Sequence, residues 1–162
     1  MTDHIERSID IAAPIPKVWA ALTDHIQFGE WFGASIDTPF RLGEVSRGKI
    51  HCMPGKTVPW EATVTAIEPQ TRFAYTWHPF AVDPEIDYTA ETPTLVEFTL
   101  KPIDTGTRLI VRESGFEGVL ASRRGEALRM NTDGWKVQIG NIARYAEANA
   151  AEGQEANATG TD

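Results

Sequence analysis

The feature that most constrains the fold is a long apolar stripe with helical spacing, which begins after Gly118. It consists of two rows with a spacing of seven residues, offset by four: Leu128, Trp135 and Ile142 in one, and Thr132, Ile139 and Ala146 in the other. Rows related in this way lie on one face of a helix. Such a helix is stable only when its stripe packs against another apolar surface.

The sequence supplies that surface as a run of short strands in which apolar and polar residues alternate. Expected strands cover residues 4–12, 41–53, 58–68, 73–77, 96–100 and 109–113. Turn-forming segments separate them, such as 54–56 and 104–106, while residues 79–93 contain three prolines and read as a loop. Alternation of this kind is typical of strands buried on one face only.

Two short helices are expected between the first and second strands. Pro14 and Pro16 end the first strand, and proline is accepted in the first turn of a helix. Residues 15–22 then have helical spacing. A second helix would be capped by Thr23 or Asp24, run to about Phe32 and stop at Gly33.

These elements predict an α+β domain. Its expected form is a curved six-stranded antiparallel sheet, with two short helices after the first strand and a long C-terminal helix packed across the sheet. The expected domain covers residues 1–148 as one unit. Residues 149–162 lack apolar side chains that could dock and carry acidic ones, so a disordered acidic tail is expected there.

Composition excludes several classes of function. The 162 residues carry a formal net charge of −8, which makes binding to a nucleic-acid backbone improbable. Cys52 is the single cysteine, so no intrachain disulfide forms. The N-terminus does not resemble a signal peptide, and no stretch of about 20 apolar residues exists to cross a bilayer. A cytoplasmic protein is expected.

Motifs for metals and cofactors are missing. The four histidines, His4, His25, His51 and His78, are far apart and show no zinc-like spacing. The acidic run in residues 83–91 does not match a calcium loop, and no glycine-rich phosphate loop or nucleophile elbow occurs. We therefore expect neither a metal nor a cofactor.

Several segments, in this order, resemble the START/Bet-v-like superfamily, also called helix-grip or SRPBCC domains. They are APIPKVWAALTD (13–24), WFG (31–33), TAIEPQTRFAYTW (65–77), GTRLIVRESGF (106–116) and GW (134–135). Within the superfamily the chain is most similar to the family named after the C-terminal domain of the activator of heat-shock protein 90 ATPase. The resemblance implies a cavity enclosed between the sheet and the long helix, with the two short helices closing one end.

The residues expected to line this cavity combine large rings with a few polar groups. They are Arg7, Trp31, Phe32, Trp60, Tyr75, Trp77, Phe98, Glu113, Leu128, Asn131 and Trp135. Pockets and cores use the same residue types, so the rings are equally compatible with an ordinary core. Alternation puts Tyr75 and His78 on opposite faces of their strand, so at most one of them lies inside.

Two charged residues interrupt apolar strand faces. Arg7 is in phase with Ile5 and Ile9, and Glu113 is in phase with Leu109 and Val111. In the resembling fold the first and last strands are antiparallel neighbours, and a buried charge needs a partner. We therefore expect an Arg7–Glu113 pair on the inner wall. The two residues would satisfy each other, orient a carboxylate or hydroxyl of a ligand, or act as a proton donor and acceptor pair.

The function that these observations favour is binding of a small hydrophobic or amphipathic molecule, such as a lipid, in an internal cavity. One alternative is an enzyme of the polyketide cyclase or dehydratase kind that uses Glu113 or His78 as a base. Another is a protein-interaction module that activates a chaperone ATPase. The sequence leaves open whether the protein is an enzyme.

Overall fold

The computed structural model describes residues 4–83 and 85–159, except for the side chains of residues 52, 53 and 152–159. Its elements are β1 (Ile5–Ile11), α1 (Ile15–Thr23), α2 (His25–Phe32), β2 (Ala34–Ile36), β3 (Val45–Met53), β4 (Lys56–Glu68), β5 (Arg72–Trp77), β6 (Thr94–Ile103), β7 (Gly106–Ser114) and α3 (Ala121–Thr159), with short 3-10 helices at Tyr88–Ala90 and Phe116–Gly118. The α+β class is as expected, and so is the order of the elements apart from β2 and the two 3-10 helices.

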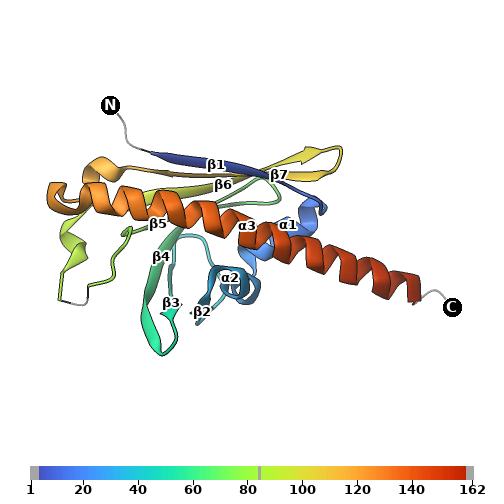
Figure 1. The fold of residues 1–162 in the computed structure, drawn as a ribbon, viewed down its shortest axis with the longest axis horizontal. Coiled ribbons are helices and arrows are strands. Elements are labelled where there is room, and N and C mark those ends of the chain that lie inside the picture. The colour runs from blue at the N-terminus through green and yellow to red at the C-terminus, as the bar shows by residue number, and fades with distance from the viewer. Residues whose placement is uncertain (1–3, 84, 160–162) are drawn as a thin grey trace.

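One antiparallel sheet has the strand order β1-β7-β6-β5-β4-β3-β2. It has seven strands, so the expectation of six is wrong. The additional strand, β2, is only three residues long, too short for alternation to be visible in the sequence. Helix α3 crosses the sheet and contacts β1, α1 and α2, and α1 and α2 lie together beside it (Figure 1).

The first and last strands are neighbours, but not in the expected register. Ile5 lies opposite Glu113, and Arg7 lies opposite Val111. The sequence had placed Arg7 opposite Glu113, which is a shift of two residues. Such a shift keeps every side chain on the same face, because side chains alternate with a period of two. The hydrophobic pattern therefore could not distinguish the two registers.

The short helices begin and end where the sequence indicated. The Asp24 carboxylate accepts a hydrogen bond from the Ile26 amide and caps α2, and Gly33 ends α2 in the left-handed conformation with φ of 90°. The Trp31 indole donates to the Ala21 carbonyl at 2.8 Å, which joins α2 to α1. The Gln138 amide donates to the Phe32 carbonyl at 2.8 Å, which joins α3 to the end of α2.

Helix α3 continues past residue 148, where the sequence indicated a boundary. Ala146 and Ala150 are both buried, and the helix runs to Thr159. Residues 149–159 are thus helical in this structure, where disorder was expected. Residues 160–162 lie outside the described part of the chain.

Gly106 allows the turn between β6 and β7 to pass beneath the end of β1. Its φ is +146°, and a β-carbon there would overlap the Ile11 carbonyl oxygen and lie 2.8 Å from the Ala13 nitrogen. We expect Gly106→Ala to lower the free energy of unfolding by about 2 kcal/mol, measured by urea denaturation. The control is Gly125→Ala in α3, where the β-carbon meets nothing within 4 Å. It should leave stability equal or slightly higher, and equal losses for both variants would contradict the role given to Gly106.

Candidate functional site

A fully buried carboxylate lies at the centre of the candidate site. Glu113 is 0% exposed and is on the inner face of β7. The strand pairing sets it in one row across the sheet with Ile5 on β1, Val96 on β6 and Tyr75 on β5. Glu113 and Tyr75 therefore face the same interior, two strands apart.

Both oxygens of Glu113 are fully hydrogen-bonded. Oε1 accepts from Asn131 Nδ2 and Trp135 Nε1, each at 2.9 Å. Oε2 accepts from Trp77 Nε1 at 2.8 Å and from Thr94 Oγ1 at 2.6 Å. Two donors come from α3 and two from the sheet, so the carboxylate joins the two layers. Four bonds use the four acceptor positions that a carboxylate offers.

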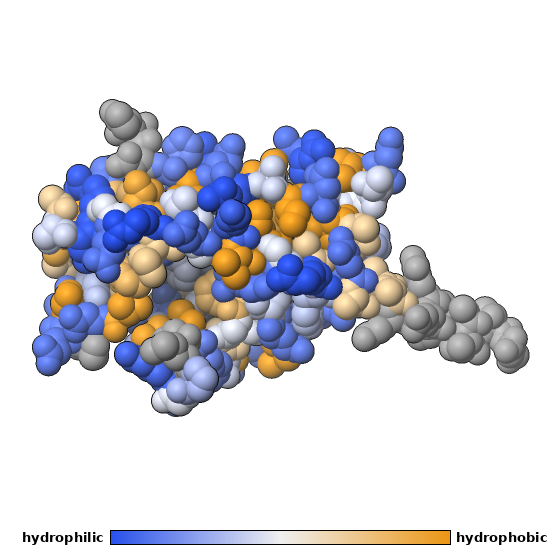
Figure 2. Space-filling model, viewed as in Figure 1, coloured by the Kyte–Doolittle hydropathy of each residue, from blue (hydrophilic) through white to orange (hydrophobic). Residues whose placement is uncertain are grey.

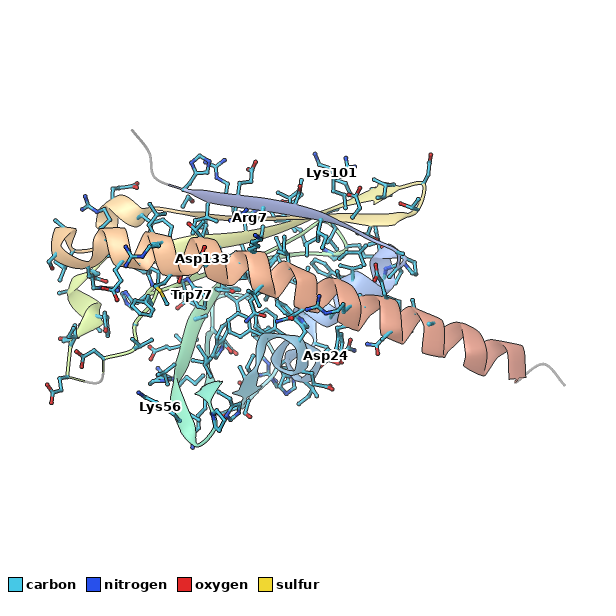
Figure 3. The ribbon with its side chains drawn as sticks, viewed as in Figure 1. Arg7, Asp24, Lys56, Trp77, Lys101 and Asp133 are labelled. Carbon is cyan, nitrogen blue, oxygen red and sulfur yellow. The ribbon has the colours of Figure 1, made fainter. Side chains whose placement is uncertain are left out.

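The expected Arg7–Glu113 pair is not formed. Arg7 Nη2 donates instead to the Thr132 carbonyl of α3 at 3.3 Å, and Figure 3 places Arg7 between β1 and α3. All four donors to Glu113 are uncharged, and in the described part of the chain it makes no ion pair. The register explains the difference, since it puts Arg7 one inward-facing row away from Glu113.

Tyr75 presents a second polar group to the same interior. The residue is 1% exposed, and its hydroxyl makes no hydrogen bond to any described residue. Its ring contacts Trp60 and Trp77, with ring centroids 5.5 Å away in each case. Burial raises the pKa of the Tyr75 hydroxyl well above 10.0, and the nearby Glu113 charge raises it further. The hydroxyl therefore keeps its proton at ordinary pH.

Aromatic rings fill much of the space between the sheet and the helices. Neighbouring ring centroids are 4.7–6.4 Å apart, distances at which rings are in contact. The cluster consists of Phe28, Trp31, Phe32, Phe40, Trp60, Phe73, Tyr75, Trp77, Phe98 and Trp135. Every residue expected to line a cavity is buried or half-buried. Most of these residues belong to the aromatic cluster and contact one another.

The surface is hollowed next to this cluster. Figure 2 shows a recess between α3 and the β3–β4 hairpin, at the position where Figure 3 places Trp77. Trp77 and four further expected residues, Arg7, Phe32, Leu128 and Asn131, are only half-buried. Trp77 donates to Glu113, so a single side chain connects the recess with the buried carboxylate.

A buried ion pair joins the acidic run of residues 83–91 to the start of α3. The Glu91 side chain is 1% exposed and the Arg123 side chain 15%, and their closest atoms are 2.5 Å apart. Glu91 also accepts from the Leu120 amide at 3.0 Å. Arg123 donates to the Pro79 carbonyl at 2.9 Å. The pair therefore fastens the loop 79–93 to the start of α3.

Opposing effects act on the pKa of Glu91. Burial raises it, but the hydrogen bonds from Arg123 and the Leu120 amide outweigh burial and leave the pKa below its ordinary value.

The positive guanidinium of Arg123 also lies 4.7 Å from the centre of the Tyr88 ring. His78 lies in the same region, and its Nδ1 is buried without a hydrogen-bond partner among the described residues.

Sequence reasoning found some of the site and missed the rest. The structure brings the predicted residue Asn131 next to Glu113, to which its amide donates a hydrogen bond. Thr94 was missed, although it is in phase with Val96 and Phe98, which is the signal that could have identified it. The Glu91–Arg123 pair had no such signal, because both residues belong to stretches rich in charge. Among the described residues no group of His, Cys, Asp or Glu could hold a metal.

Comparisons with known proteins agree with this architecture. A crystal structure of a Mesorhizobium loti protein is 26% identical, with a TM-score of 0.68 over 90% of this chain and 97% of that one. DynU16, a protein of the dynemicin biosynthetic locus, is also 26% identical, with a TM-score of 0.69 over 91% of this chain and 48% of that one. An Arthrobacter aurescens protein solved by NMR reaches a TM-score of 0.74 at 17% identity, over 90% of this chain and 87% of that one.

No curated protein matches the chain. None of the helices in residues 4–83 and 85–159 has the length and apolar composition needed to cross a membrane.

The family model described as Activator of Hsp90 ATPase homolog 1-like protein matches residues 12–147, which is most of the chain. The resemblance inferred from the motifs is therefore confirmed, and the chain belongs to the Activator of Hsp90 ATPase homolog 1-like family.

Proposed function

We propose that this protein binds a small, mainly apolar molecule between the sheet and α3, and that the molecule enters at the recess beside Trp77. The observation that carries the proposal is the Glu113 carboxylate. It is buried among aromatic rings, has no cationic partner in the part of the chain that the structure describes, and is separated by one hydrogen bond from a hollow in the surface. Pockets with apolar walls and a few convergent polar groups are the usual form of small-molecule sites.

Entry of a ligand requires the recess to deepen. Phe32 belongs to the aromatic cluster and Leu128 packs against the core, and both are half-buried. No hydrogen bond to Glu113 holds either of them, so they are the side chains expected to move. Changes of rotamer at a binding site are common even where the backbone stays in place. We therefore propose that a cavity between the sheet and α3 is formed, or enlarged, as the ligand enters.

An enzyme of the polyketide cyclase or dehydratase kind is the second candidate. It is favoured by the similarity to DynU16, because that protein belongs to a biosynthetic locus. Glu113 would then be the base, but its acceptor positions are all occupied by Trp77, Thr94, Asn131 and Trp135. A base must be within hydrogen-bond reach of the proton that it takes. Binding does not require Glu113 to give up any of these four hydrogen bonds, so we prefer it to the enzyme. We also prefer it to a module that activates a chaperone ATPase.

The proposal predicts binding of a neutral apolar dye. N-phenyl-1-naphthylamine should bind the native protein with a stoichiometry near one, measured by fluorescence titration, because its size and apolar character suit a pocket of this kind. Leu128→Trp, which adds bulk at a half-buried position of α3 that packs against the core, should weaken binding by about tenfold, in line with the cost of overpacking.

Val137→Trp is the matched control. Val137 is on the same helix but 61% exposed, so this variant should bind the dye as the unaltered protein does. Native mass spectrometry of gently purified protein should also find a retained small molecule that Leu128→Trp has lost. If the native protein binds no dye and retains no ligand, or if both variants bind equally well, the proposal is wrong.

A further inference from the structure

The Tyr75 hydroxyl is a buried polar group that makes no hydrogen bond to any described residue. In the described part of the chain, only Tyr75 Oη and His78 Nδ1 are buried side-chain atoms of this kind. Leaving such a group unpaired destabilises the folded protein. A native structure that keeps it calls for a specific explanation.

Glu113 does not accept a hydrogen bond from this hydroxyl, although it shares a row of the sheet with Tyr75. Asn131 and Trp135 occupy one of its oxygens, and Trp77 and Thr94 occupy the other. The Tyr75 ring is in contact with the ring of Trp77, the residue at the recess. A polar donor is thus directed into the aromatic cluster at the inner end of the proposed entry route.

We propose that the Tyr75 hydroxyl donates a hydrogen bond to the ligand, and that the site selects an uncharged molecule with an acceptor oxygen, such as a ketone, over a carboxylate. This inference rests on the proposed binding function. The inference assigns the polar contact with the ligand to Tyr75. Glu113 holds Trp77, Asn131 and Trp135 in place around the ligand.

The charges around the site account for the preference for an uncharged molecule. Glu113 has no cationic partner among the described residues, and Arg7 directs Nη2 to the Thr132 carbonyl. Arg123, whose side chain is 15% exposed, is paired with Glu91. A second negative charge next to Glu113 would be repelled where water cannot screen it. The Tyr75 hydroxyl is kept protonated by burial and by the Glu113 charge, so it serves as a donor across ordinary pH.

The test uses three probes of similar size: 2-acetylnaphthalene, 2-ethylnaphthalene and 2-naphthoate. Tyr75→Phe should raise the Kd of the ketone by about tenfold, because one hydrogen bond in a dry site is lost. The Kd of the hydrocarbon should change by less than about twofold, so the ratio of the two effects isolates the contact between hydroxyl and oxygen. In the unaltered protein at pH 7, 2-naphthoate should bind more weakly than the ketone.

Tyr145→Phe is the matched control. The Tyr145 hydroxyl donates to Glu30 at 3.2 Å in an exposed hydrogen bond between α3 and α2, and its removal should alter none of the three Kd values. Tyr75→Phe should be at least as stable as the unaltered protein, because it removes an unpaired polar group. A second measurement needs no variant: the infrared carbonyl band of bound 2-acetylnaphthalene should lie at lower frequency than in hexane.

The possible failures are distinct. If neither the ketone nor the hydrocarbon binds the unaltered protein, the binding function itself is wrong. If both bind but Tyr75→Phe affects them equally, or the carbonyl band is not shifted, Tyr75 is not the donor. If 2-naphthoate binds as tightly as the ketone, the exclusion of anions is overturned.

Discussion

Glu113→Gln is expected to lower the free energy of unfolding by about 3 kcal/mol, the cost of leaving more than one buried donor unsatisfied. Glutamine keeps the shape but replaces one acceptor oxygen with an NH2 group. That group would face either Asn131 and Trp135 or Trp77 and Thr94, all of which donate to the carboxylate. Because the donors come from both α3 and the sheet, the loss weakens the contact between the two layers.

Urea denaturation measures this effect, and the melting temperature should fall by about 6–12 °C for a domain of this size. Glu61→Gln is the control, because Glu61 is 61% exposed and its ion pair with Arg47 lies at the surface. It should change stability by less than about 1 kcal/mol. Equal effects of the two substitutions would show that the hydrogen bonds to Glu113 contribute little.

A double-mutant cycle tests whether Arg7 and Glu113 act together. The two residues do not pair, so Arg7→Met and Glu113→Gln should add to within about 0.5 kcal/mol. A paired arrangement would give a different result, because removing Arg7 would then recover much of the loss caused by Glu113→Gln. Recovery of this kind would favour the register in which Arg7 lies opposite Glu113.

Glu91→Gln is expected to cost about 3 kcal/mol as well, because it leaves the Arg123 guanidinium largely buried without its counter-charge. The Glu91 side chain is 1% exposed and the Arg123 side chain 15%, so water replaces little of the lost interaction. The loop 79–93 should loosen, since Arg123 also holds the Pro79 carbonyl. Urea denaturation measures the loss, and hydrogen exchange should be faster in this loop.

The same contact makes stability depend on pH. The pKa of Glu91 is lowered by folding below its ordinary value of 4.5, so the unfolded chain binds the proton more readily. The contribution of Glu91 is therefore fully present above about pH 4.5 and is lost as the pH falls through the folded pKa. The stability difference between the unaltered protein and Glu91→Gln should shrink below pH 4.5. Glu85→Gln, at an exposed position of the same loop, should differ little at any pH. A difference that grows on acidification would contradict this account.

Much of the fold follows from local chemistry that the sequence displays. The alternation in strands and the seven-residue stripe in α3 identify elements because each has a period that burial on one face imposes. Asp24 and Gly33 mark the limits of α2, because a cap and a left-handed residue depend on the few residues around them. The inward direction of Glu113 was likewise visible, since it is in phase with Leu109 and Val111.

The partners of Glu113 are a matter of tertiary structure alone. Arg7 and Ile5 are on the same face of β1, and the hydrophobic pattern accepts either of them opposite Glu113. Neither Thr94 nor Trp77 is near Glu113 in sequence, and their bonds to it depend on how β5, β6 and β7 align. The sequence by itself therefore determined which residues face the interior, because side-chain direction has a local period. Only the tertiary structure decided which of them meet, because register and the placement of α3 depend on contacts between segments far apart in the chain.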